Sequence, residues 1–115
     1  MQYLLLLYVN EGGFASLTKE QQEQGVAAYG AYSEALTKAG AIKLSSRLQG
    51  SSAATTVRVA NGKSQVLDGP YADSKEQIGG FFLIDVPDLD TAISWAARCP
   101  AASHGVVEVR PLWSM

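Results

Sequence analysis

The chain has 115 residues, of which 47% are apolar and 17% charged, and its net charge is −2. This length fits a single domain (residues 1–115) with a core of its own, and this composition excludes a disordered, charge-rich chain. The absence of a basic run argues against nucleic-acid binding. Cys99 is the sole cysteine, so an internal disulfide is excluded and a reducing, cytoplasmic compartment is favoured.

The chain opens with "MQYLLLLYVNEGG", in which residues 3–9 are all apolar. This run has no basic flank, unlike a signal peptide, and it is far shorter than the ~18 apolar residues of a membrane span. We therefore predict a strand with both faces covered and no association with a membrane. The following "NEGGFAS" is predicted to be a loop.

A long helix is predicted next. Thr18, followed three residues later by Gln21, fits a capping box at its start, and Gly40 fits the position just past its end. Steps of three and four residues place five side chains on one face: Gln22, Val26, Tyr29, Ser33 and Leu36. Residues 41–48, "AIKLSSRL", then read as a strand.

The segment "TTVRVANGKSQVL" reads as a β-hairpin. Asn61-Gly62 supplies the two positive-φ positions that a tight hairpin turn requires. Val57 and Val59 alternate with more polar neighbours, which predicts that one face of the hairpin is exposed to solvent.

The last third of the chain predicts two strands around a helix. "GGFFLIDV" is a second strand with apolar residues at nearly every position, and "GVVEVRPLW" is an alternating closing strand. Between them, "DLDTAISWAARC" is predicted to be a helix capped by Asp88, followed by a small-residue loop. Its inward-facing residues are predicted to be Leu89, Ala92, Ile93 and Ala96.

The predicted elements follow the order strand, helix, strand, hairpin, strand, helix and strand. This order indicates an α+β fold of the ferredoxin-like, split βαβ type, with an inserted hairpin. The apolar runs 3–9 and 81–86 would then be the two central strands. Both helices would cover the same face, leaving an apolar face open, and a patch of several hundred Å² is rare on a soluble monomer. We therefore predict a homodimer that packs its open sheet faces about 10 Å apart as a dimeric α+β barrel.

The stretch "LDGPYADSKEQIGG" carries the main catalytic candidates, Asp68 and Lys75. In one interpretation Asp68 is a general base or an orienting carboxylate at a pocket mouth, with Lys75 stabilising developing negative charge. In the other, Asp-Gly-Pro is a rigid turn, and Asp73 or Ser74 caps a single helical turn that launches the next strand. Both interpretations stay open at this stage.

Four further residues are candidates for contacting a substrate: Tyr71, Glu76, His104 and Arg110. His104 follows Pro100 in a loop and is either a surface residue or an acid–base group. Arg110 pairs with Glu108, either as an exposed ion pair or as a lining of a pocket for a polar ligand. With one histidine and one cysteine no zinc site made of those residues can assemble, and we predict no metal and no cofactor. Cys99, near a helix C-terminus, is predicted to be buried and inert.

These residues resemble a known family. "TTVRVANGKSQVLDGPYADSKEQIGGFFLIDVPDLDTAISWAARCP" with the closing "VEVRPLW" is similar to the DGPF-domain proteins of the YCII-related family, and the likeness extends over nearly the whole chain. Tyr71 stands where the family usually has Phe, and Asp73 where it usually has Glu. The residues that carry the resemblance are Asp68, Gly69, Pro70, Tyr71, Asp73, Lys75, Glu76, Gly79, Gly80, Asp88, Asp90, Ala92, Trp95 and Val107–Pro111.

The resemblance implies a dimeric α+β barrel and a small-molecule enzyme with a His/Asp pair in a cleft, for which lyase-like dehydrochlorination is the known kind of chemistry. The aspartate of that pair corresponds to Asp68, whereas the predicted first helix contains no histidine to match its partner. Many members of the family also occur with sigma factors of the extracytoplasmic-function type, which implies a regulatory association.

Three functions are therefore expected as alternatives. The first is a YCII-related small-molecule enzyme or enzyme-like pocket protein that performs acid–base, lyase-type chemistry without a metal. The second is a non-catalytic dimer that senses a ligand or binds a partner in sigma-factor regulation. The third is a cofactor-free, oxygenase-like barrel, which would require a deep apolar cavity.

Overall fold

The computed structural model of the protein describes residues 1–114. Its main sheet is antiparallel and has the strand order β2-β5-β1-β6. These strands are β1 (Gln2–Val9), β2 (Ile42–Arg47), β5 (Gln77–Asp85) and β6 (Val106–Pro111). The two strands that were predicted to be apolar throughout, β1 and β5, are the two central strands of this sheet.

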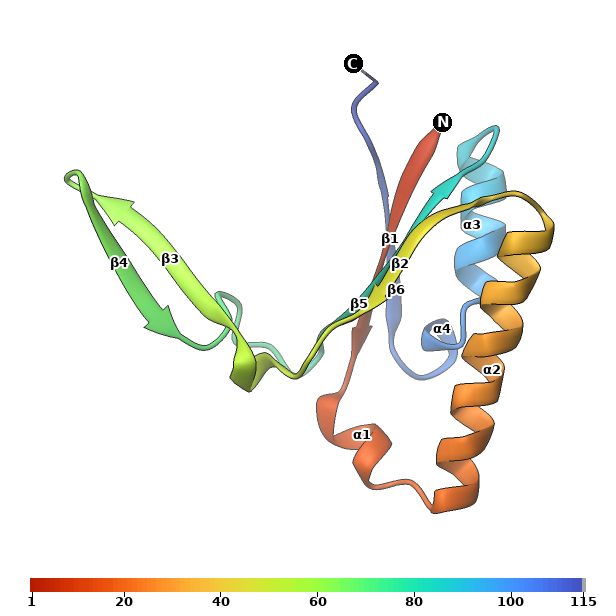
Figure 1. Ribbon diagram of the computed structural model, residues 1–115, viewed down its shortest axis with the longest axis horizontal. Coiled ribbons are helices and arrows are strands. Elements are labelled where there is room, and N and C mark those ends of the chain that lie inside the picture. The colour runs from red at the N-terminus through yellow and green to blue at the C-terminus, as the bar shows by residue number, and fades with distance from the viewer. Residues whose placement is uncertain (115) are drawn as a thin grey trace.

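Helices cover one side of the sheet. The long α2 (Lys19–Lys38) and α3 (Leu89–Arg98) lie on the same side of it, as Figure 1 shows. The mixed α+β class is thus confirmed. Within residues 1–114, no helix combines the length and the apolar character that crossing a membrane demands.

Two short helices replace predicted loops. Residues predicted as the loop "NEGGFAS" contain α1 (Glu11–Ala15), whose start is capped by the Asn10 side chain accepting a hydrogen bond from Gly12 N at 3.2 Å. The predicted small-residue loop contains α4 (Ala101–His104), so His104 ends a helix. Both loop predictions are wrong because adjacent glycines and single turns carry little helical signal, whereas a side-chain cap and a preceding proline can each support one turn.

The core lies between the sheet and the helices. Alternate residues of the central strands are buried there, and Leu5, Leu36, Ile84 and Cys99 are the largest fully buried side chains. Tyr32 of α2 joins three elements, since its hydroxyl donates to the Trp95 carbonyl at 2.7 Å and its ring meets that of Phe82 edge-on at 5.2 Å. Cys99 is buried as predicted, and burial raises the pKa of its thiol, which disfavours the reactive thiolate.

The predicted inner face of each long helix is only partly correct. Ala92 and Ala96 of α3 are buried, but Leu89 and Ile93 are each 49% exposed. A stripe of alanines lets the helix lie close to the sheet, and the residues to one side of that stripe then face water. Val26 of α2 is also exposed, because the N-terminal part of α2 extends beyond the sheet (Figure 1).

The predicted hairpin forms, but it stands apart from the sheet. β3 (Thr55–Ala60) and β4 (Lys63–Asp68) make a separate two-stranded sheet, and its turn has positive φ angles of 52° at Asn61 and 75° at Gly62, as predicted. We call β3–β4 the arm. Figure 1 shows it reaching away from the body, and the radius of gyration of 16.1 Å exceeds the ~13 Å expected of a compact chain of this length.

The prediction that only one face of the arm is exposed to solvent is wrong for the isolated chain, in which both faces are exposed. Val57 and Val66 form a cross-strand pair, and both are exposed. Nothing in residues 1–114 covers that face, because the arm leaves the body before its alternating pattern begins. A short 3-10 helix, η1 (Ser51–Ala53), leads into the arm.

The Gly79-Gly80 step forms a β-bulge between the two central strands. Leu7 pairs with Gly80 whereas Tyr8 pairs with Ile78, so Gly79 is the extra residue. Neither glycine has room for a side chain, since an added Cβ would lie 2.8 Å from Val9 Cγ2 at position 79 and 2.9 Å from the Ser46 carbonyl oxygen at position 80. The bulge turns Ile78 onto the face of the sheet that α2 and α3 leave uncovered.

A close backbone approach at Gly105 yields a first prediction. A Cβ at this position would lie 2.1 Å from the Tyr8 carbonyl oxygen, so one strand would have to move. We expect Gly105→Ala to lower the free energy of unfolding by about 1–3 kcal/mol, as overpacking usually does. Urea unfolding followed by circular dichroism measures the change.

Gly30→Ala is the matched control, because an added Cβ there meets nothing within 4 Å in the middle of α2. Relief of the helix cost of glycine should raise stability by about 0.5–1 kcal/mol. Equal effects of the two substitutions would contradict the packing described at Gly105.

Candidate functional site

A cleft of about 660 Å³ lies at the base of the arm, and we call it the elbow cleft. Its walls come from the end of β1, from the segment that enters the arm and from the segment that leaves it. Thirteen residues line it, and none has a charged side chain: Tyr8, Leu48, Gln49, Gly50, Ser51, Ala53, Ala54, Pro70, Tyr71, Ala72, Ser74, Gln77 and Ile78.

The β-bulge positions one wall of this cleft. Tyr8 and Ile78 are paired directly after the extra residue Gly79 and therefore share a face of the sheet. This is the face opposite the helices, and Figure 1 shows the arm projecting on the same side of the sheet.

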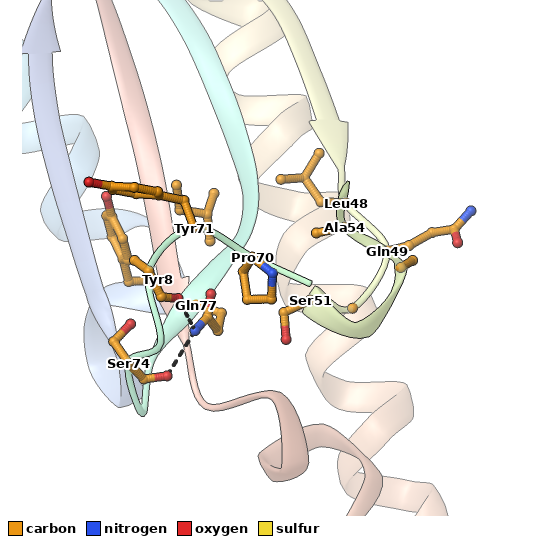
Figure 2. Close-up of a pocket in the computed structure, with 13 residues that line it drawn as sticks. Tyr8, Leu48, Gln49, Ser51, Ala54, Pro70, Tyr71, Ser74 and Gln77 are labelled. Carbon is orange, nitrogen blue, oxygen red and sulfur yellow. Dashed lines mark hydrogen bonds between the residues drawn. The ribbon is translucent and has the colours of Figure 1, made fainter. Parts of the chain in front are cut away.

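Two tyrosines and a proline dominate the cleft. In Figure 2 Tyr8 and Tyr71 lie in one group with Ser74 and Gln77, with Pro70 toward the opposite wall. Tyr71 is 80% exposed, and the Arg58 guanidinium lies 5.8 Å from the centre of its ring. Aromatic faces and a proline ring suit a flat organic molecule.

Side-chain hydrogen bonds hold the walls in place. Gln77 Nε2 donates to the carbonyl oxygens of Ala72 at 3.0 Å and of Ser74 at 2.9 Å, which fixes the segment leaving the arm (Figure 2). On the other wall, the Glu11 carboxylate accepts from Ser51 N at 2.7 Å and from Ser51 Oγ at 2.8 Å. The cleft is thus built from connectors that are tied to the body.

A smaller hollow of about 290 Å³ adjoins the elbow cleft, and the two share Pro70 and Tyr71. Its lining includes Asp68, the predicted catalytic carboxylate, which is exposed at the end of β4. Gly69 has the positive φ of 104° that the turn interpretation requires, and its N–H donates to the Ala54 carbonyl at 2.8 Å. The Asp-Gly-Pro segment therefore forms the exit turn of the arm and places Asp68 beside Tyr71.

The structure does not bring the other predicted residues into this site. Lys75 is exposed and Glu76 is half-buried, and neither lines either hollow. The helical turn expected to begin at Asp73 or Ser74 does not form. The segment instead makes a series of bends, and the Gln77 side chain fixes them by donating hydrogen bonds to backbone carbonyl oxygens. His104 is exposed on α4, away from both linings.

Arg110 lies with Glu108 on β6, and the pair belongs to the face of the sheet opposite the helices. Glu108 is in register with Leu6, and Arg110 with Leu4. Arg110 Nε lies 3.2 Å from Glu108 Oε2 as an ion pair, and that buried oxygen has no hydrogen-bond partner among residues 1–114. The two charges attract each other, but one carboxylate oxygen lacks a donor.

A comparison with known protein families identifies the family of this chain. The model of the YCII-related domain matches residues 1–115. A protein of Rhizobium meliloti (strain 1021), described as uncharacterized, is 38% identical over 114 residues, which are 97% of this chain and 92% of that protein. The chain therefore belongs to the YCII-related family, of which DGPF is a synonym.

A solved structure supports the fold. The 5-chloro-2-hydroxyhydroquinone dehydrochlorinase (TftG) from Burkholderia phenoliruptrix AC1100, in complex with 2,5-dihydroxybenzoquinone, superimposes with a TM-score of 0.56. The sequences are 19% identical, and the match covers 99% of this chain and 94% of that one. At this identity the likeness concerns the fold.

Sequence reasoning found Tyr71 and Asp68 but missed Tyr8, Ser51 and Gln77. Tyr8 was assigned to a strand, and nothing in its local pattern indicates that it ends at a cleft. The only available signal was topological, since the end of the first strand, the entry to the hairpin and its exit meet at the same end of such a sheet.

The two hydrogen bonds of Gln77 generate a second prediction. We expect Gln77→Ala to release residues 70–76, so that their amide hydrogens exchange faster by about tenfold or more, while the unfolding midpoint changes little because the bonds are local and exposed. Hydrogen exchange followed by mass spectrometry measures this.

Gln49→Ala serves as the control, since Gln49 also lines the cleft and makes none of these bonds to the exit segment. Unchanged exchange of residues 70–76 in Gln77→Ala would show that the glutamine does not hold the wall.

Proposed function

We propose that the elbow cleft binds a small, flat, uncharged organic molecule, an aromatic ring with hydroxyl groups, and that the protein is an enzyme-like pocket protein built around this site. The observation that carries the proposal is the lining, which combines two tyrosines with hydroxyl and amide groups and includes no charged side chain. A charged ligand would lose its hydration there without gaining an opposite charge, whereas a flat ring can stack and hydrogen-bond.

The relatives support the choice of ring. The dehydrochlorinase with a similar fold is named for a chlorinated hydroxyhydroquinone and was solved with a benzoquinone derivative. A hydroquinone-like ring is small enough for a cleft of about 660 Å³. The likeness supports a compact aromatic as the ligand class, and the cleft lining supports an uncharged one.

Asp68 is the proposed proton acceptor of a lyase-type reaction without a metal. It lines the smaller hollow that shares Tyr71 with the elbow cleft, so a ring that extends past Tyr71 into this hollow would reach the carboxylate. Lys75, seven residues further along the same connector, is the proposed group that stabilises developing negative charge. Tyr71 would hold the ring, with Glu76, Arg110 and His104 left as outlying contacts.

We further propose a homodimer formed through the open face of the main sheet, each chain being one ferredoxin-like half of a dimeric α+β barrel in the cytoplasm. Leu4 and Leu6 of β1 and Phe81 and Leu83 of β5 point away from α2 and α3 and remain half-exposed, because buried residues alternate with them along both strands. The unsatisfied oxygen of Glu108 lies on the same face, where a second copy could supply the missing donor.

A second candidate is a non-catalytic dimer that senses a ligand, including one linked to sigma-factor regulation. It is favoured by one specific observation: no carboxylate, imidazole or amine lines the elbow cleft itself. The cofactor-free oxygenase alternative has less support, since that chemistry calls for a deep apolar cavity and Tyr71 stands mostly in solvent.

Ligand choice is the third prediction. Hydroquinone should bind at least tenfold more tightly than 2,5-dihydroxybenzoate, which adds a carboxylate to the same ring, because the cleft has no charge to pair with it. Tyr71→Ala should weaken hydroquinone binding by tenfold or more, and Tyr71→Phe much less. Isothermal titration calorimetry measures the affinities.

Trp113→Ala is the control, as Trp113 is an exposed aromatic outside the cleft. Preference for the carboxylate, or equal losses in Tyr71→Ala and Trp113→Ala, would contradict the proposed site. Asp68→Asn separates the two candidate functions: an enzyme keeps binding and loses turnover of chlorinated hydroquinones, whereas a sensor shows no turnover with either protein.

The dimer gives the fourth prediction. Leu6→Lys places a charge in the middle of the open face and should raise the dissociation constant of the dimer by a hundredfold or more. Sedimentation velocity over a dilution series measures it. Ala28→Lys on α2 adds the same charge at an exposed position on the helix side of the sheet and should leave the constant within about threefold. A folded wild-type monomer at micromolar concentration would contradict the dimer.

A further inference from the structure

The arm has an apolar face made of three valines. Val57 and Val66 are opposite each other in the register, and Val59 lies two residues further along β3 on the same face. Their exposed fractions are 60%, 62% and 67% respectively. We call these three residues the valine face.

The opposite face of the arm has a different character. Thr56, Arg58, Gln65 and Leu67 share that face and line the smaller hollow together with Tyr71, whose ring the Arg58 guanidinium approaches. Leu67 is 65% exposed there, but its neighbours are polar or charged and tolerate water, whereas a cluster of valines gains from leaving it. Of the two faces, the valine face therefore gains more from a covering surface.

The arm also requires support because it consists of only two strands. An isolated two-stranded hairpin is at best marginally stable in water. Hydrogen bonds at its base, such as that from Gly69 N to the Ala54 carbonyl at 2.8 Å and that from Thr56 Oγ1 to the Gly69 carbonyl at 2.8 Å, fix where it starts. Among the elements of residues 1–114, β3 and β4 make extensive contacts only with each other, and the projecting arm contributes to the extents of 48 × 44 × 18 Å.

The position of the arm identifies the surface that can cover it. Figure 1 shows the arm projecting on the side of the main sheet that lacks helices. A second copy seated on that open face would therefore lie beside the arm. With two strands of six residues against a four-stranded sheet, the arm would enlarge the contact area by about half, and a stable interface needs about 800 Å² from each partner.

We propose that the arm packs through its valine face on a second copy of this chain, so that two arms clasp the dimer and the elbow cleft lies at the interface. This inference rests on the proposed dimer and goes beyond it. Tyr8 and Ile78 belong to the open face and Pro70 and Tyr71 to the arm's exit, so a partner that touches both surfaces borders the cleft from its open side.

Adjacent residues of β4 provide a matched test, since Val66 and Gln65 point to opposite faces of the same exposed strand. Val66→Lys and Gln65→Lys add the same charge. We expect Val66→Lys to raise the dimer dissociation constant by at least tenfold in sedimentation velocity and Gln65→Lys by less than threefold. Equal effects, or no effect of Val66→Lys, would overturn the inference.

The Leu6→Lys variant distinguishes this failure from failure of the dimer itself. If Leu6→Lys dissociates the dimer and Val66→Lys does not, the sheet interface stands and the clasping arm is wrong. If the wild-type protein is a monomer, both proposals fail together.

Hydrogen exchange of the wild-type protein provides an independent readout that needs no variant. We expect the amides of residues 55–68 to exchange slowly in the dimer. On dilution their exchange rates should rise by at least tenfold, in parallel with the loss of dimer. Exchange that does not depend on concentration, whether fast or slow, would contradict docking of the arm on a second copy.

Discussion

Two helices cover only one face of the main sheet, although its central strands carry apolar side chains on both faces. The rest of the structure follows from this imbalance. Burying Leu5 and Ile84 beneath α2 and α3 leaves their neighbours Leu6 and Leu83 on the far side. Exposed apolar surface of this extent is costly in water. It favours pairing of the sheet with another surface, and it sets the side of the molecule on which an interface and a binding site can share residues.

The arm extends the same imbalance beyond the sheet. A hairpin inserted between β2 and β5 has no helix to pack on, so both its faces meet solvent in the single chain. Its entry and exit segments must return to the sheet at one edge. A glycine bulge at Gly79 and a positive-φ turn at Gly69 make that return, and the elbow cleft is the space left between them.

The chemistry of the cleft differs from the simplest expectation for this family. The carboxylate of the Asp-Gly-Pro turn is Asp68, and it faces a hollow next to the cleft. The first long helix carries no histidine to complete a His/Asp pair. The ligand recognition that we propose therefore rests on tyrosines and uncharged polar groups, and Asp68 lines the hollow that shares Tyr71 with the cleft.

Local sequence determined the longer elements and several of their ends, although α1 and α4 were predicted as loops. The capping box at Thr18, the cap at Asp88 and the turn at Asn61-Gly62 all form as their patterns predict, because each depends on residues a few positions apart. The apolar runs likewise identified β1 and β5 as the central strands. The family and the mixed α+β class could also be inferred before any coordinates were known.

Only the tertiary structure decided which residues meet. Leu89 and Ile93 continue the apolar periodicity of α3 but are each 49% exposed, whereas Ala92 and Ala96 are buried. Ile78 reaches the cleft through the bulge at Gly79 in its own strand, and Lys75 remains outside the cleft although the motif places it near Asp68 in sequence. Such outcomes depend on register and on the path of the arm, which are set by contacts between residues distant in the chain.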